Sequence, residues 1–386
     1  MADEGTAVPA ARRRVLFVVD TLSGGGAERF VSTCLAHLDR ASFEPHLALL
    51  RDEVVYPLPD DVHPVILGKR RWWHFGRAAR RLAAWLHEHR PHVVLSALEH
   101  CSAITDAALN KATVPRPFWI ARTANQPQHG LNWIESSRRQ QAYRHADRIL
   151  ANSQGSADAF VRMYPFTRHK LRVIGNPTDF EQIDRMAREP VDLPDADVPT
   201  VIAVARLAQQ KRPDVLVEAF ARVRSQMVAR LAICGDGPQR RAVERLVRDR
   251  GLADCVVLAG FQPNPYAWMA RSDLFVLSSD YEGLPNALIE AQGLGLPAVS
   301  TSCPSGPSEI IEDGVTGILV PCGNAARMAE AVLALLQDTD RRRAFGQAAR
   351  QRIRQQYGVG PLLSELCALL RERTTSGPPH DERKTT

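Results

Sequence analysis

Residues 281–299 read YEGLPNALIEAQGLGLPAV, and this stretch indicates more about the chain than any other. Pro285 has no backbone N–H to donate, so it suits the first position of a helix that continues through Asn286. The amides of a helix start lie at the positive end of the helix dipole and favour phosphate. We therefore expect a diphosphate here, with Glu290 facing a ribose and Glu282 facing a sugar ring. The alternative is an ordinary helix start with two solvated acids.

Outward from this stretch, short apolar segments alternate with amphipathic helices in two series. The first series comprises 15–20, 45–50, 62–67, 92–97, 117–121, 148–151 and 171–174, and the second comprises 201–205, 231–234, 256–259, 274–277, 298–301 and 317–320. Such alternation predicts an α/β fold with two Rossmann-like domains, which we expect to face each other across a cleft. Ligands of such sheets bind beyond the carboxyl ends of the strands.

The expected domain boundaries follow from these series. We expect a disordered N-terminus over 1–13, a first domain over 14–180, an acidic and proline-bearing linker over 181–199, a second domain over 200–355, a C-terminal helix over 356–373 and a disordered tail over 374–386.

Composition excludes several classes of protein. The 386 residues are 45% hydrophobic and 24% charged, which is ordinary for a globular protein. No run of eighteen apolar residues predicts a membrane span, and the polar, then basic, start is unlike a secretory signal. Seven scattered cysteines form no Cys-x-x-Cys pair, as expected for isolated thiols in a reducing cytoplasm. The net charge of +6 suits anionic small molecules or lipid surfaces, and no nucleic-acid-binding pattern accompanies it.

Other loops after strands carry candidate ligand-binding residues. Arg206 and Lys211 follow the strand over 201–205, where a guanidinium and an ammonium suit a diphosphate. Gly235 lies in a glycine turn that would allow close backbone approach, and a plain tight turn is the alternative. Phe261 and Gln262 follow the next strand.

The first domain also has a glycine loop after its first strand, GGGAER at residues 24–29. A dinucleotide-binding fingerprint would need glycine or alanine at the position of Arg29, so we reject binding of NAD. Glu28 and Arg29 are explained as well by exposure in the first turn of a helix as by a role in ligand binding.

These features resemble the retaining GT-B glycosyltransferases of family 4, the glycosyl transferases group 1. The resemblance rests on the Glu-x7-Glu pair Glu282 and Glu290, on Arg206 with Lys211, and on the GGAER loop. The loops over 260–266 and 302–309 look most like bacterial UDP-N-acetylhexosamine transferases that act on lipid-linked glycans. Arg212 departs from the glycine that commonly follows the lysine.

The resemblance implies a role for each domain and residue. The first domain would bind the acceptor, the second would bind the nucleotide sugar, and the last helix would cross back onto the first. Glu282 and Arg122 would be catalytic, although many members have a histidine where Arg122 stands. His100 and His129 are expected to be structural or surface residues. The residues implied to bind the donor are Gly25, Gly26, Arg206, Lys211, Gly235, Phe261, Gln262, Gly283, Leu284, Pro285, Asn286 and Glu290.

The implied reaction transfers a hexosamine, N-acetylgalactosamine or N-acetylglucosamine, from UDP to a polyprenyl-diphosphate-linked glycan with retention of configuration. UDP-sugar is then a substrate, and we expect no cofactor and no metal, because cations and a helix start would neutralise the leaving UDP. Arg70, Arg71, Trp72 and Trp73 mix cations with aromatic rings, as on a membrane interface, although an ordinary connection with inward-packed tryptophans explains them equally well. We expect a cytoplasmic protein, peripheral on the inner face of the plasma membrane.

Three other functions remain open from the sequence. A UDP-N-acetylglucosamine 2-epimerase shares the two-domain architecture but needs no acceptor. A non-catalytic sugar-nucleotide-binding subunit would not release UDP. A Rossmann oxidoreductase would bind a nicotinamide cofactor.

Overall fold

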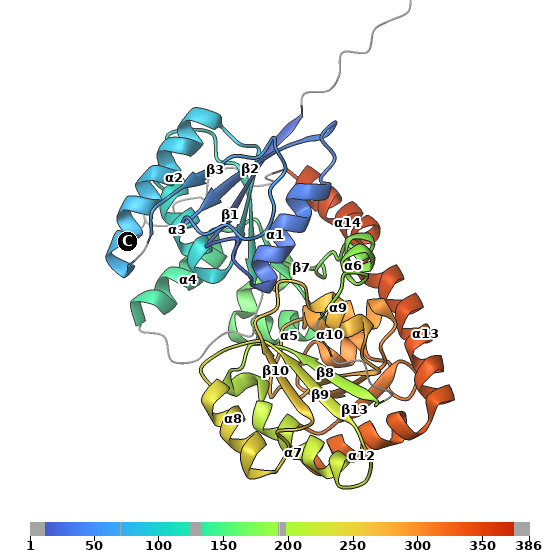
Figure 1. Cartoon of the computed structure of the whole chain (residues 1–386). Coiled ribbons are helices and arrows are strands. Elements are labelled where there is room, and N and C mark those ends of the chain that lie inside the picture. Colours follow the sequence, from blue (N-terminus) through green and yellow to red (C-terminus); the bar gives the residue numbers. More distant parts are fainter. Residues whose placement is uncertain (1–11, 70, 124–132, 192, 194–197, 374–386) are drawn as a thin grey trace, which may run out of the picture. The chain divides into compact units, whose positions relative to one another are not determined.

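A computed structural model describes residues 12–69, 71–123, 133–191, 193 and 198–373. The chain forms two compact units (Figure 1). The first unit comprises residues 1–151, 160–174 and 363–386, and the second comprises residues 152–159 and 175–362. Within the described residues no helix is both long and apolar enough to cross a lipid bilayer.

The first unit is built on a seven-stranded sheet with the order β3-β2-β1-β4-β5-β6-β7. Every neighbouring pair in this sheet is parallel. Its strands are β1 (Arg13–Val19), β2 (Phe43–Leu49), β3 (Pro64–Ile66), β4 (Val93–Ala97), β5 (Phe118–Thr123), β6 (Arg148–Ala151) and β7 (Leu171–Val173). Its helices are α1 (Gly26–His37), η1 (Trp72–His74), α2 (Phe75–His89), α3 (Glu99–Leu109), α4 (Trp133–His145) and η2 (Pro165–Lys170).

Helices α5 (Gln154–Met163) and α14 (Val359–Arg371) each have residues in both units. The end of α14 belongs to the first unit. There the Arg371 guanidinium lies 5.2 Å from the ring centre of Phe43, and Arg148 pairs with Glu372 at 2.6 Å.

The second unit has a six-stranded parallel sheet with the order β10-β9-β8-β11-β12-β13. Its strands are β8 (Thr200–Val204), β9 (Arg230–Cys234), β10 (Val256–Gly260), β11 (Leu274–Leu277), β12 (Ala298–Thr301) and β13 (Gly317–Val320). Its helices are α6 (Phe180–Met186), η3 (Gln209–Lys211), α7 (Pro213–Arg224), α8 (Arg240–Asp249), α9 (Pro265–Ala270), α10 (Asn286–Leu294), α11 (Pro307–Ile310), α12 (Ala325–Gln337) and α13 (Thr339–Tyr357).

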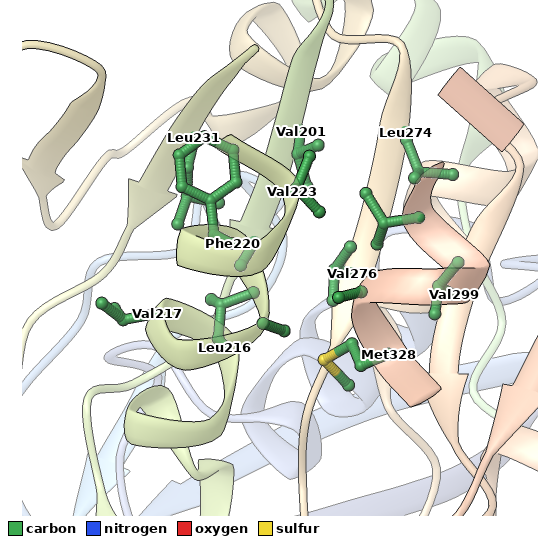
Figure 2. Packing of buried hydrophobic residues seen from close by; sticks show 14 of the residues in the cluster. Val201, Leu216, Val217, Phe220, Val223, Leu231, Leu274, Val276, Val299 and Met328 are labelled. Atoms are coloured by element: carbon green, nitrogen blue, oxygen red, sulfur yellow. The ribbon is translucent and has the colours of Figure 1, made fainter. Parts of the chain in front are cut away.

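The core of the second unit explains why its strands are almost wholly apolar. Figure 2 shows Phe220 and Val223 of α7 packed beside Val201 of β8, with Met328 of α12 near Val276 of β11. All of these side chains are at most 2% exposed. Because a central parallel strand is covered on both faces, both of its side-chain rows are buried. The sheet is therefore a rigid base for the loops that follow its strands.

The architecture predicted from the sequence, two α/β units with parallel sheets, is confirmed. Every strand expected from the alternation is present, and the observed bounds differ from the expected ones by at most two residues. The expected first-domain boundary at residue 180 differs from the structure, in which Gly175 already belongs to the second unit.

The expected linker over 181–199 is also different, because its first part is a packed helix. Asp179 caps α6 by accepting a hydrogen bond from the Gln182 amide at 2.8 Å. Phe180 and Ile183 are buried, and Arg354 of α13 donates to Asp184 at 2.6 Å. The two apolar residues lie three positions apart, so they share one face of the helix, and this face is buried against the unit. The acidic composition of the segment did not predict a packed helix.

Candidate active site

The candidate residues of the second unit follow the carboxyl ends of its strands. Arg206 follows β8, Gly235 follows β9, Phe261 follows β10 and Glu282 follows β11. Since all strands of this sheet are parallel, these loops emerge at one edge. Arg206 and Phe261 are exposed there, Phe261 at 66%. The edge thus combines a cation, an aromatic ring and a carboxylate.

Glu282 and Lys211 form the central ion pair of this edge. Lys211 Nζ lies 2.5 Å from Glu282 Oε1, and Ser279 Oγ donates to the same oxygen at 2.6 Å. The Glu282 side chain is 6% exposed and that of Lys211 is 22% exposed. The pair joins residues 71 positions apart in the sequence. A carboxylate this buried needs such partners, because an unpaired buried charge is strongly unfavourable.

Lys211 itself is held by the loop that follows β11. Ser278 Oγ donates to the Lys211 carbonyl at 2.7 Å, and the Gln210 side chain donates to the Tyr281 carbonyl at 2.7 Å. Arg212, which follows in a left-handed conformation with φ of 47°, contacts Asp280 at 3.3 Å. These contacts fix the turn η3 against the residues before Glu282.

The backbone on the other side of Glu282 is held by serines and by a glycine. Ser305 Oγ donates to the Glu282 carbonyl, and Ser153 Oγ donates to the Gly283 carbonyl at 3.1 Å. Gly306 has a φ of 87°, and a Cβ there would lie 2.7 Å from Pro285 Cδ. Only glycine therefore lets this loop pass so close to the turn before α10.

The start of α10 lies one residue later than expected. Pro285 is the N-cap with extended backbone, φ −74° and ψ 99°, rather than the first helical residue, because its ψ places it before the helical turn. The side chain of Pro285 makes no capping hydrogen bond to this helix start. Asn286 accepts a hydrogen bond from Asn176 at 2.6 Å, and Gly283 and Leu284 are buried. Glu290, one turn further along, is 3% exposed.

Gly235 brings two strand ends into close contact. Its φ is 148°, and a Cβ at this position would lie 1.9 Å from the carbonyl oxygen of Ala205. Its amide also donates to the Gly260 carbonyl at 2.7 Å. The glycine thus lets the ends of β8, β9 and β10 pack together. This packing explains why position 235 is a glycine, with no need for a ligand.

The loop after β10 has one exposed ring and two side chains bound to the protein. Gln262 donates to the Ala259 carbonyl at 2.6 Å. Asn264 caps α9 by accepting from the amides of Tyr266 and Ala267, and it donates to the Met186 carbonyl at 2.8 Å. Phe261 is the exposed member of the expected donor-binding pair, whereas Gln262 mainly shapes the loop.

In the first unit, Arg122 lies inside the fold. The strand β5 continues through Thr123, two residues beyond the expected end, so Arg122 is a strand residue and its side chain is 0% exposed. Its guanidinium carbon lies 4.1 Å from the ring centre of Phe30 in α1, and burial lowers the pKa of Arg122 to about 10. With its side chain buried against Phe30, Arg122 packs under α1, and the expected catalytic role stays a prediction.

The remaining expected residues of the first unit lie in two loops. Gly25 and Gly26 are exposed at the start of α1. Arg71 is exposed and its guanidinium stacks over Trp73 at 4.9 Å, while Trp73 is 54% exposed. Arg70 falls outside the described residues, and Trp72 belongs to η1.

Three residues that sequence reasoning passed over complete the site. Ser279 binds the Glu282 carboxylate, Ser305 binds its carbonyl, and Glu309 accepts from the Gln154 and Gly155 amides at 2.7 and 2.9 Å. The signal that could have found Ser279 is the polar pair directly after β11, since strand ends of a parallel sheet are the usual positions for ligand-binding side chains. Across the described part of the chain, no group of three or more His, Cys, Asp or Glu side chains could hold a metal ion.

Comparison with known proteins identifies the family. The profile described as Glycosyltransferase Family 4 matches residues 24–182, and the profile described as Glycosyl transferases group 1 matches residues 184–352. The chain belongs to the family 4 glycosyltransferases. The two matches together cover most of both units, so this glycosyltransferase carries both halves of the family architecture.

Relatives and solved structures agree with this placement. The N-acetylgalactosamine-N,N'-diacetylbacillosaminyl-diphospho-undecaprenol 4-alpha-N-acetylgalactosaminyltransferase of Campylobacter jejuni is 27% identical over 349 residues, which span 86% of this chain and 92% of that protein. The lipopolysaccharide core biosynthesis glycosyltransferase LpsE of Rhizobium meliloti is 30% identical over 56% of this chain and 61% of its own length. The structure of Anabaena HepE in complex with UDP and glucose has a TM-score of 0.77 at 20% identity, covering 93% of this chain and 99% of that one.

These comparisons fix the class of the protein. The solved structure shares the two-unit GT-B fold. The chain is therefore a glycosyltransferase with the GT-B fold.

Proposed function

We propose that this glycosyltransferase moves an N-acetylhexosamine from UDP to a hydroxyl group of a polyprenyl-diphosphate-linked glycan, with retention of anomeric configuration. The observation that carries the proposal is the Lys211–Glu282 pair beside the start of α10. This arrangement combines a cation, a carboxylate and backbone amides at the carboxyl edge of one sheet. Those are the groups that a diphosphate joined to a sugar requires.

The cations and the carboxylates of the site would contact different parts of the donor. Arg206, Lys211 and the amides at the start of α10 would bind the diphosphate and stabilise the charge that develops on UDP as it leaves. Both contacts of Glu282 reach Oε1, so we assign its other oxygen, Oε2, to hydroxyl groups of the transferred sugar. Glu290 would bind the ribose.

Retention then follows if the leaving phosphate accepts the proton of the attacking hydroxyl on the same face of the sugar. The C1–O bond to UDP breaks, the new C1–O bond to the acceptor forms, and the acceptor proton passes to the departing phosphate oxygen. In this scheme no carboxylate attacks the sugar. Glu282 acts by stabilising positive charge on the ring, and Lys211 holds its carboxylate in place.

Support for the donor and acceptor comes from the relatives. The name of the Campylobacter jejuni relative specifies transfer of N-acetylgalactosamine to a diphospho-undecaprenol acceptor, and HepE binds UDP. N-acetylgalactosamine and N-acetylglucosamine are therefore the first two sugars to test.

The decisive experiment measures UDP release from a panel of UDP-sugars, with and without a polyprenyl-diphosphate glycan extract. We expect acceptor-dependent release from one UDP-N-acetylhexosamine and from no UDP-hexose at a comparable rate. Release of free or epimerised sugar without acceptor would favour the epimerase reading. Binding of UDP-sugars without any release would favour a non-catalytic subunit.

We also propose that transfer needs no metal ion. The support is that Arg206, Lys211 and a helix start already supply positive charge to the diphosphate. In the same assay, EDTA is expected to leave the rate unchanged. A large loss that Mn²⁺ restores would contradict this proposal.

A third part of the proposal is that the first unit contacts anionic lipid. Helix α2 buries Ala78 and Leu82 and exposes Arg77, Arg80 and Arg81, and the exposed pair Arg71 and Trp73 precedes it. An aromatic ring with several arginines on one face suits a membrane interface, where each basic residue contributes about 1 kcal/mol of attraction to anionic lipid.

The double variant Arg77→Glu with Arg80→Glu is expected to weaken binding to phosphatidylglycerol vesicles at least about tenfold in a sedimentation assay. Vesicles of phosphatidylcholine should bind neither protein. The matched control changes Arg245 and Arg248 to glutamate on the exposed face of α8, in the second unit. Equal loss in both double variants would show that only net charge matters and would contradict a surface on α2.

A further inference from the structure

The first unit carries a second polar cluster, at the carboxyl edge of its own sheet. Asp20 directly follows β1, Arg51 lies just after β2, and His100 is the second residue of α3, just after β4. Arg51 binds both oxygens of Asp20, at 3.2 and 2.8 Å, and His100 Nε2 lies 3.5 Å from Asp20 Oδ2. The three side chains therefore form one network over adjacent strand ends, the position where α/β sheets bind ligands.

The network keeps Asp20 ionised. Burial alone would raise the pKa of Asp20, but hydrogen bonds from His100 and Arg51 hold that pKa well below its usual range. Two further carboxyl groups interact electrostatically with His100, those of Glu28 in α1 and Glu99 in α3, and burial raises the pKa of each. Glu99 is paired with Arg139 of α4. Asp20 is the carboxylate in direct contact with His100.

The backbone before His100 is strained. Leu98 has a φ of 83°, a conformation that is unfavourable for a residue other than glycine. Its amide donates to the Arg122 carbonyl at 3.2 Å. Strained residues persist where the surrounding structure imposes them, and they concentrate at functional sites. Here the strain turns the chain from β4 into α3 so that His100 emerges over the strand ends.

A second histidine of this unit serves as a comparison. His145, the last residue of α4, lies 2.7 Å from Asp106 near the end of α3. Because α3 begins at the carboxyl end of β4 and β6 begins after α4, this pair lies toward the amino edge of the sheet. Among the described residues of this unit, the Asp20–His100 pair lies at the ligand-binding edge and the Asp106–His145 pair does not.

We propose that His100, oriented by Asp20, binds a hydroxyl group of the glycan acceptor. This assignment rests on the proposed function. The His100 side chain is 38% exposed and so is accessible to a ligand. Nε2 of His100 is directed at Asp20, which leaves Nδ1 to form a hydrogen bond with a hydroxyl group of the acceptor. Asp20 is a positioning residue in this arrangement, and Arg51 holds it in place.

The test separates acceptor kinetics from donor binding. His100→Gln is expected to lower kcat/KM for the polyprenyl-diphosphate glycan extract by about 10- to 100-fold, the cost of one hydrogen bond to a polar site. The Kd for UDP should stay within about twofold of that of the unsubstituted enzyme, because Arg206, Lys211 and Glu290, proposed to bind the nucleotide, lie in the second unit. His100→Asn should behave in the same way, which guards against a folding defect of one variant.

His145→Gln is the matched control and should leave acceptor kinetics unchanged. Asp20→Asn is expected to reduce acceptor kcat/KM in the same direction as the His100 variants. Normal turnover with unchanged acceptor kinetics in His100→Gln would overturn this assignment alone. Absence of turnover by the unsubstituted protein with every UDP-sugar would overturn the proposed function and this assignment with it.

Discussion

Replacing Glu282 by glutamine is expected to lower kcat for sugar transfer by about 10²- to 10³-fold, the usual effect of removing one electrostatic stabiliser from an active site. Glutamine keeps the size of the side chain and can still accept hydrogen bonds from Lys211 and Ser279. What it removes is the negative charge. If Glu282 stabilises positive charge on the sugar ring, the loss must fall on the transition state rather than on donor binding.

The measurement is single-turnover transfer together with the Kd for the UDP-sugar. We expect kcat to fall while Kd for the donor changes less than about fivefold. Thermal unfolding should change little, since the hydrogen bonds of residue 282 are preserved. A fall in donor affinity with unchanged kcat would instead make Glu282 a ground-state binding residue and would contradict its assigned role.

Replacing Lys211 by alanine is expected to reduce kcat/KM by a similar factor of about 10²–10³, for two reasons. The diphosphate loses a cation, and the Glu282 carboxylate, 6% exposed, loses the partner that lies 2.5 Å away. A buried carboxylate without its cation tends to take up a proton. The variant should therefore lose both affinity for UDP and turnover, in contrast to Glu282→Gln.

The control for Lys211→Ala is Arg250→Ala in the same unit. Arg250 pairs with Glu218 at 2.6 Å, yet its side chain is 49% exposed, so the pair should contribute little to stability or activity. The double variant of Lys211 and Glu282 gives a further check. If the two residues act together, the double variant should be about as active as the less active of the two single variants. Fully multiplicative losses would show that the ion pair has no functional role.

The packing of the first unit shows what local sequence patterns cannot predict. Arg122 was expected to be catalytic because it stands at the end of the expected strand, where many members of the family have a histidine. The strand continues past it, and α1 covers the position with Phe30. A pattern of apolar residues cannot reveal this burial. An arginine interrupts the pattern like any polar residue, even where its side chain is buried and stacked on an aromatic ring.

His100 is the opposite case. In the sequence it is one histidine beside an acid, and nothing indicates that Asp20, eighty positions earlier, contributes to it. The sheet order places β4 next to β1, and this brings the residues after the two strands together. The same holds for Glu282 and Lys211, whose loops follow the neighbouring strands β11 and β8.

The sequence by itself determined the architecture, the strand positions and the loops that carry the candidate donor-binding residues. These depend on local regularities: apolar runs for buried parallel strands, proline and glycine at turns, and carboxylates near a helix start. Only the tertiary structure decided which charges pair, which serines hold Glu282, that residues after Asp179 form a packed helix, and that Arg122 is buried. Those outcomes depend on strand order and on burial, which bring together residues distant in sequence and are not encoded in any short segment.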